Sequence, residues 1–383
     1  MLCPPVFCLS HLRVIAALRK SHLMRNLVTW SITLGVAVCV SARVSAQHYQ
    51  QINLVSDVAG LAATQDPNLV NPWGLTASGT SPWWVADNGT GVSTLYNGAG
   101  QKLSLVVTVP PPLGSPPPST PTGVVFNGSS DFQVGPNQPA RFIFVTEDGT
   151  ISGWNPGANP TNAILKVSNA GSAIYKGATL AQANGANFLY VANFFNGSVD
   201  VFDKNYVQVP VPPGAFTDPN LPDGFAPFNV QNISGNVFVT FAKQSDNKHD
   251  EVDGPGLGFV DAFDSNGVLL QRLRSGHWMN APWGVALAPA GFGKLSGKLL
   301  VGQFGSGEIA SFDPINGNFQ GLLRGLHGQP LEIEGLWALR FGNGANAGPL
   351  NTLFFTAGID GEQHGLFGTI TPIHEKDDDT DGI

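Results

Sequence analysis

An internal repeat of roughly 50 residues constrains the fold of this chain more than any other feature. Six times along the sequence, a short apolar strand opens with Pro-x-Gly-(Val/Leu) or a variant of it. Taking the glycine or its equivalent in each copy as an anchor gives Gly74, Gly123, Gly177, Asn229, Gly284 and Trp337. Repeats of this length are typical of propellers, solenoids and arrays, in which each copy is one supersecondary unit.

Each repeat carries further segments rich in β-forming residues, and no helical period separates them. The second strands are expected at 83–86, 141–146, 188–192, 237–241, 298–303 and 352–357. The 47 glycines and 29 prolines are dispersed, and only 12% of residues are charged, which argues against long surface helices and coiled coils. The pattern therefore predicts an all-β fold, a six-bladed β-propeller with four antiparallel strands per blade.

The sixth repeat lacks a fourth strand, because it runs out after its third strand near 367–373. The apolar stretch 51–55 precedes the first repeat and has no partner of its own. We expect it to supply the outer strand of the sixth blade and so close the ring, which removes an open sheet edge. Residues 47–374 are predicted to form this single domain.

The first 46 residues have the pattern of a secretory signal peptide: a basic start, an apolar run at 30–40 and small residues before Gln47. Met24 is the better start codon by this pattern. The alternative, a membrane anchor, needs about 20 apolar residues. All three cysteines lie in this leader, so the predicted mature chain, extracellular or periplasmic, has none. Residues 375–383 are predicted to be a disordered acidic tail that resembles the beginning of a calcium loop.

The Pro-x-Gly-Val openings, the apolar second strands and the Phe-Asp-x-x-Gly turns resemble the NHL-repeat and SMP-30/gluconolactonase-like superfamily of six-bladed propellers. Within it, the chain is most similar to an uncharacterised secreted bacterial family. The resemblance spans about residues 52–373 and implies a divalent metal in the central funnel, held by acidic and asparagine ligands. The motifs specify the fold more than the activity, so no catalytic residue is transferred.

The ends of the second strands provide the candidate metal site, because these ends open on one face around the axis. Four of the six carry a carboxylate or an amide: Asp87, Glu147, Asn193 and Gln303. Such oxygen ligands suit Ca²⁺ or Mg²⁺. The alternative is that these side chains cap strand ends and link blades by hydrogen bonds.

Other polar and aromatic side chains near the same face complete the candidate site. We expect Glu334 or His364 as a general base, and Asn71, Trp73, Trp283, Lys243 and Asp360 as ligand-binding residues. The tryptophans could instead fill space between blades. The charged segment 244–258 is a candidate lid or second cation site, or only a solvated loop.

Two functions remain open on the sequence alone. One is a metal-dependent, lactonase-like hydrolase that acts on a lactone, ester or glycan-derived substrate. The other is a non-catalytic extracellular binding or protein-interaction module. The net charge of −8 makes nucleic acid an unfavourable partner, and we expect a monomer that binds a small molecule or glycan.

Overall fold

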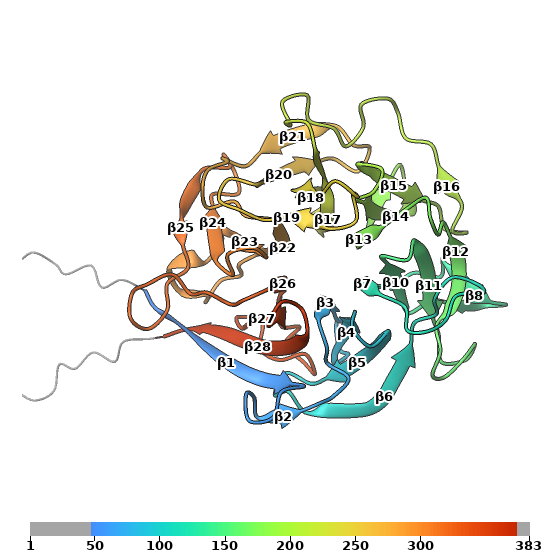
Figure 1. The fold of residues 1–383 in the computed structure, drawn as a ribbon, viewed down its shortest axis with the longest axis horizontal. Coiled ribbons are helices and arrows are strands. Elements are labelled where there is room, and N and C mark those ends of the chain that lie inside the picture. The colour runs from blue at the N-terminus through green and yellow to red at the C-terminus, as the bar shows by residue number, and fades with distance from the viewer. Residues whose placement is uncertain (1–46, 374–383) are drawn as a thin grey trace, which may run out of the picture. The chain divides into compact units, whose positions relative to one another are not determined.

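The computed structural model describes residues 47–373, which form six β-sheets around a central axis (Figure 1). The four main strands of each blade pair antiparallel, and the short strand at the outer edge of blade 6 pairs parallel. Within the described range the helical structure is limited to the short 3-10 turn η1 (Gly293–Leu295). The prediction of an all-β, six-bladed propeller is confirmed. The predicted leader and acidic tail lie outside the described residues.

The first three blades follow the chain, each from its innermost strand outward. Blade 1 contains β3 (Pro72–Thr76), β4 (Trp83–Asp87), β5 (Val92–Tyr96) and β6 (Lys102–Thr108). Blade 2 contains β7 (Pro121–Phe126), β10 (Phe142–Thr146), β11 (Thr150–Trp154) and β12 (Ile164–Ser168). Blade 3 contains β13 (Tyr175–Ala183), β14 (Ala186–Asn193), β15 (Ser198–Phe202) and β16 (Gln208–Val209). A small separate hairpin joins β8 (Gln133–Gly135) and β9 (Gln138–Pro139).

The remaining blades complete the ring. Blade 4 contains β17 (Phe225–Ile233), β18 (Asn236–Gln244), β20 (Gly258–Phe263) and β21 (Leu269–Arg272), with β19 (Glu251–Val252) paired to β18. Blade 5 contains β22 (Pro282–Leu287), β23 (Leu299–Gln303), β24 (Ile309–Phe312) and β25 (Phe319–Leu322). Blade 6 contains β26 (Leu336–Phe341), β27 (Leu353–Ile359), β28 (His364–Pro372) and β1 (Tyr49–Ser56), with β2 (Thr64–Gln65) beyond β1.

The N-terminal strand closes the ring, as the sequence predicts. β1 pairs antiparallel with β28 from Tyr49 opposite Pro372 to Ser56 opposite Leu366, and the two strands lie side by side in Figure 1. The outer edge of blade 6 is therefore built from the opposite end of the described chain.

The repeated glycine is explained by the close approach of neighbouring innermost strands. A Cβ on Gly74 would lie 2.5 Å from the carbonyl oxygen of Thr122, and one on Gly284 would lie 2.5 Å from that of Trp337. In blade 6 the strand register corrects our anchor. Because Leu336 pairs with Ala357 as Pro282 pairs with Gln303, Ala338 takes the glycine position and Trp337 precedes it.

The residues just before these anchors meet at the axis and fill it. One comes from each blade: Trp73, Thr122, Lys176, Phe228, Trp283 and Trp337. The ring of Trp73 stacks on Trp337 at 3.5 Å and also contacts Phe228 of the opposite blade at 6.3 Å. Two predicted ligand-binding residues, Trp73 and Trp283, are thus only 2% and 5% exposed and pack in the core.

No helix among residues 47–373 is long and apolar enough to cross a membrane.

Candidate functional site

The funnel face is the side of the ring where the innermost strands begin and the second strands end. Backbone hydrogen bonds define equivalent positions there, because in blades 1, 2, 3 and 5 the residue after the second strand donates to the residue before the innermost strand. The N–H of Asn88 donates to Asn71 O at 3.1 Å, and that of Glu147 donates to Thr120 O at 3.0 Å. Glu147 is therefore equivalent to Asn88, one residue beyond the position of Asp87.

This shift by one residue separates Glu147 from the other three predicted metal ligands. In a strand, successive side chains point to opposite faces, so a shift of one changes the side chain's surroundings completely. The pairs Pro72–Asp87, Tyr175–Asn193 and Pro282–Gln303 place Asp87, Asn193 and Gln303 at the last paired position of their strands. The corresponding residue in blade 2 is Thr146, opposite Pro121.

Asp87, Asn193 and Gln303 are fully buried, and each makes hydrogen bonds within its own blade. One oxygen of Asp87 accepts from the N–H and the hydroxyl of Thr94, at 3.0 and 2.8 Å. The amide of Asn193 donates to Asp200 at 2.9 Å, and Gln303 accepts from the N–H of Asn280 at 2.8 Å. These contacts agree with the structural alternative, in which the side chains cap the strand ends.

Glu147 instead faces the axis and pairs with Lys176. Its Oε1 atom lies 2.6 Å from Lys176 Nζ, and its Oε2 atom accepts from Asn88 at 2.8 Å. Lys176 is 1% exposed and its ammonium lies 5.0 Å from the ring centre of Trp73. Burial alone would lower the pKa of Lys176, but the surrounding carboxylates, Glu147 first, outweigh it and raise this pKa.

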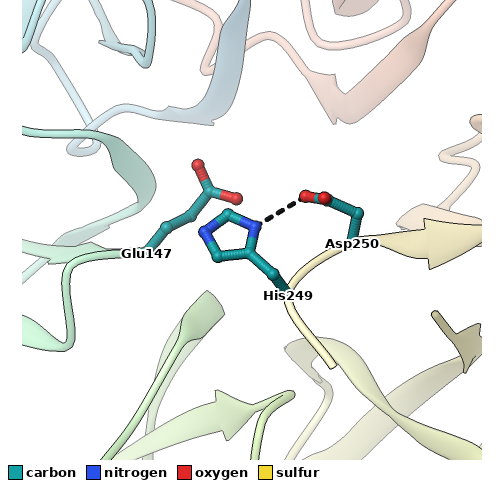
Figure 2. A group of neighbouring side chains, drawn as sticks. All are labelled: Glu147, His249 and Asp250. Atoms are coloured by element: carbon teal, nitrogen blue, oxygen red, sulfur yellow. Dashed lines mark hydrogen bonds and ion pairs between the residues drawn. The ribbon is translucent and has the colours of Figure 1, made fainter. Parts of the chain in front are cut away.

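The segment between β18 and β20 reaches over the funnel face from blade 4. It folds back on itself because β19 pairs with the end of β18, with Lys243 opposite Val252 and Gln244 opposite Glu251. We call residues 245–257 the lid loop. The pairing places the tip of this loop, with His249 and Asp250, next to Glu147 of blade 2 (Figure 2).

Glu147, His249 and Asp250 form a group whose ligand atoms all lie within 4.8 Å of one another. Figure 2 shows the imidazole of His249 between the two carboxylates, with Nδ1 bonded to Asp250 at 2.6 Å. The Nε2 atom is on the other side of the ring. A histidine that holds a metal commonly binds a carboxylate through its second ring nitrogen in this way.

The carboxylates around Lys176 outnumber the cations. Glu147 and Asp250 lie within 4.0 Å of its ammonium, and Glu251 and Glu362 interact with it electrostatically. Burial raises the pKa of Glu251 to about 7, although Lys176 opposes the shift. Burial also raises the pKa of Glu362, against a hydrogen bond from Asn71. A bound cation would relieve this excess of negative charge.

Two pockets open on the funnel face beside this group. One of about 330 Å³ is lined by Glu147, Asp148 and His249 among others. A larger one of about 500 Å³ is lined by four acidic residues, by Phe304 and Ser306, and by five glycines. The acidic residues are Asp253, Glu332, Glu334 and Glu362.

The predicted base Glu334 lines the larger pocket, where its carboxylate accepts from the N–H of Gly361 at 3.3 Å. The other predicted base, His364, bonds through Nδ1 to Asp57 at 2.6 Å, at the junction of β28 with β1. Within residues 47–373, neither side chain forms a hydrogen bond or an ion pair with the other or with Glu147. Glu362, two residues before His364, lines the larger pocket and interacts electrostatically with Glu147, so it is a further candidate for the general base.

The remaining predicted ligand-binding residues are divided between the network and its surroundings. Asn71 belongs to the network, because its amide donates to Glu362 at 2.7 Å and its oxygen accepts from Trp337 at 3.0 Å. Lys243 lies over the ring of Phe225, at 5.5 Å, in blade 4. Asp360 is exposed in the turn between β27 and β28.

Sequence reasoning missed Lys176, the centre of this network. Its signal was present, because Lys176 occupies the repeat position that holds tryptophan in blades 1 and 5. A lysine at a position that holds a large apolar residue in four of the other five blades indicates a buried charge with a partner. Asn88 and Glu362 had no such signal, because both lie in turns.

The fold and the funnel face define a six-bladed β-propeller with an acidic, lid-covered centre. No family model matches the chain. It is 31% identical over 327 residues to uncharacterized protein L690 of Acanthamoeba polyphaga mimivirus, covering 83% of this chain and 84% of that protein. It is also 31% identical to uncharacterized protein R648 of the same virus, covering 83% and 78%. The chain belongs to the family of these mimivirus proteins.

Solved structures with the same fold are much more distant in sequence. A streptogramin B lyase has a TM-score of 0.50 at 11% identity, covering 85% of this chain and 98% of its own. A Bacteroides thetaiotaomicron protein of unknown function has a TM-score of 0.52 at 13% identity, covering 86% and 76%. At such identities the likeness concerns the propeller fold alone.

Proposed function

We propose that this protein is a secreted propeller that binds a divalent cation on its funnel face through Glu147 and His249, with Asp250 orienting the imidazole of His249. A small or oligomeric substrate would lie in the adjoining 500 Å³ pocket, where a lactone, ester or glycan-derived linkage is hydrolysed. The observation that carries the proposal is the convergence of the three ligand atoms within 4.8 Å. The secretion part rests on the sequence of residues 1–46.

The chemistry of the donor set fits a divalent cation. Glu147 offers a carboxylate oxygen and His249 an imidazole nitrogen, and Asp250 adds a second negative charge beside the imidazole. The imidazole widens the choice beyond Ca²⁺ and Mg²⁺, because nitrogen ligands also suit Mn²⁺ and Zn²⁺. Lys176 occupies Oε1 of Glu147, but each carboxylate oxygen can accept more than one partner. Lys176 also orients this carboxylate toward the lid loop.

A bound divalent cation polarises a carbonyl oxygen and lowers the pKa of bound water. The residues of this chain would supply the rest. Asp250 fixes the orientation of His249 through Nδ1, and Glu334 or Glu362 in the larger pocket can accept a proton. Burial raises the pKa of Glu362, and a carboxyl with a raised pKa is a better proton acceptor than an ordinary glutamate.

Thermal unfolding of the purified protein tests the cation site. We expect Ca²⁺, Mg²⁺, Mn²⁺ or Zn²⁺ to raise the melting temperature in a saturable way after EDTA treatment, because the folded state alone would bind the ion. Glu147→Gln and His249→Ala should abolish the shift. Asp246→Asn, which removes an exposed lid-loop carboxylate outside the three-residue group, is the matched control and should retain it. An equal shift in all variants would assign the ion to another part of the chain.

The alternative function is a non-catalytic binding propeller. It is favoured by the structural use of Asp87, Asn193 and Gln303, which leaves Glu147 as the one member of the predicted metal set facing the lid loop. Under this alternative the cation would order the lid loop without turnover. A screen of lactones and esters with and without the cation separates the two functions.

A further inference from the structure

On the face of the propeller opposite the funnel face, the charged side chain of Arg340 has no carboxylate partner among residues 47–373. Arg340 lies near the end of β26, where its partner in the strand register is Phe354. β26 begins on the funnel face at Leu336, opposite Ala357, so Arg340 is displaced along the axis toward the other face. The side chain is partly buried between the innermost strands and is far along the strand from the Lys176 network.

Most of the hydrogen-bonding capacity of Arg340 is unused. Its Nε atom donates to the carbonyl oxygen of Leu75 at 3.2 Å. A guanidinium has five N–H donors, so the four on its two terminal nitrogens have no acceptor among residues 47–373. Among the same residues no carboxylate lies within ion-pair distance of Arg340.

Two cavities meet at this guanidinium. One, of about 220 Å³, is lined by Gln231, Asn232, Val285 and Arg340 among others. The second is a water-sized space of about 10 Å³ on the axis, also lined by Gln231, Val285 and Arg340. Arg340 is the one charged residue lining either cavity.

The electrostatic surroundings agree with this geometry. Burial lowers the pKa of Arg340 to about 10, and no neighbouring charge contributes to the shift. The group is still a cation at neutral pH. A partly desolvated cation without a counter-ion costs folding free energy, unless something else in the cavity compensates it.

We propose that the 220 Å³ cavity is a binding site for a small oxyanion, a carboxylate or a phosphate, held by the guanidinium of Arg340. The planar fork of terminal N–H groups matches two oxygens of such an anion. Gln231 supplies an additional donor, because its amide is committed only to a long 3.3 Å bond to Asn232 O. The volume exceeds that of several water molecules, about 30 Å³ each, so it accommodates phosphate or a short carboxylic acid.

Isothermal titration of the full-length protein with sodium phosphate and with sodium succinate, against sodium chloride at matched ionic strength, tests the site. We expect saturable binding of one or both anions. Binding of phosphate alone or of succinate alone identifies the class of oxyanion. Arg340→Met should weaken the binding at least about tenfold, and Arg340→Lys, which keeps the charge but loses the fork, should weaken it less. Arg324→Met is the control, because Arg324 is exposed and its side chain bonds only to Gly328 O.

Unfolding without added anion gives a second readout. We expect Arg340→Met to melt at or above the temperature of the unaltered protein, because it removes an unpaired cation. Added phosphate or succinate should raise the melting temperature of the unaltered protein above that of Arg340→Met. Absence of binding to the unaltered protein, or equal binding by Arg340→Met, would overturn the proposal.

If Arg340→Met does not fold, phenylglyoxal labelling of the unaltered protein gives the answer. Phosphate or succinate should slow the modification of Arg340 but not of Arg324, as measured by peptide mass spectrometry. Equal labelling of Arg340 with and without the anions would also overturn the proposal. Because this site is on the other face from Glu147, its outcome is independent of the cation site.

Discussion

The ammonium of Lys176 lies 2.6 Å from a carboxylate oxygen of Glu147 at the centre of the ring. The same ammonium is 4.0 Å from Asp250 in the lid loop. One buried cation thus links the innermost strand of blade 3 to blade 2 and to the lid loop of blade 4. Below it, the stacked tryptophans fill the axis, so a ligand on the funnel face would meet this charged layer first.

Replacing Lys176 with methionine should strongly destabilise the protein. The substitution leaves the carboxylates of Glu147 and Glu251 without their main counter-charge in a buried site. Breaking a buried pair in this way costs about 3 kcal/mol or more. Urea unfolding measures the loss in the free energy of unfolding.

The double variant Lys176→Met/Glu147→Gln is the control for this prediction. It removes both charges of the pair, so it should recover part of the stability lost in Lys176→Met. A Lys176→Met protein that loses less than about 1 kcal/mol would show that the ammonium is solvated like a surface lysine.

Replacing Asp87 with asparagine should improve stability more at high pH than at low pH. Burial first, and then the nearby charge of Asp66, raise the pKa of Asp87 well above its usual value, and its Oδ1 atom has no partner. A raised carboxyl pKa stabilises the fold below the unfolded value of about 4, and this stabilisation is lost as the pH rises toward the folded value. Melting temperatures at pH 4 and pH 8 check the sign. A deficit of Asp87→Asn that grows with pH would contradict it.

His364 should stabilise ring closure in a pH-dependent way. Its hydrogen bond to Asp57 raises the pKa of His364, and Asp57 also accepts from the N–H of Gly365 at 2.8 Å. The stabilisation is present below the unfolded pKa of about 6.5 and disappears as the pH rises through the folded value. His364→Gln should therefore melt below the unaltered protein at pH 6 and match it at pH 9. An equal deficit in melting temperature at both pH values would mean that the charge of His364 does not contribute to the stability of ring closure.

Asp250→Asn should weaken the proposed cation site without unfolding the protein. The exposed carboxylate of Asp250 bonds to Nδ1 of His249, and its loss would leave the imidazole free to reorient. Removing such an orienting partner typically lowers metal affinity 10- to 100-fold. Calorimetric titration with Mn²⁺ measures the change, and an unaltered affinity would exclude Asp250 from the site.

Much of the fold could be predicted because the same strand pattern occurs six times in the sequence. The glycine anchors reflect a steric demand between innermost strands, and the unpaired stretch 51–55 indicated how the ring closes. The anchor in blade 6 was assigned one residue early, because Trp337 was aligned with glycines instead of with Trp73 and Trp283.

The candidate site was harder to predict because it depends on the face to which each side chain points. Glu147 and Asp87 look equivalent in sequence, yet the strand register makes Glu147 equivalent to Asn88. The side chain of Asp87 is instead buried within blade 1, where it bonds to Thr94. The contact between His249 and Glu147 depends on the pairing of β19 with β18 in blade 4. This pairing positions the lid loop so that its tip lies beside the turn of blade 2 that carries Glu147. No local pattern encodes such a long-range contact.

Diffraction from crystals grown with Mn²⁺, recorded at the manganese absorption edge, would test the central claim most directly. The account predicts an anomalous peak between Glu147 and His249, within bonding distance of both, and its loss in crystals of Glu147→Gln. Ordered Glu147 and His249 side chains without a peak, at Mn²⁺ concentrations that saturate the thermal shift, would contradict the account.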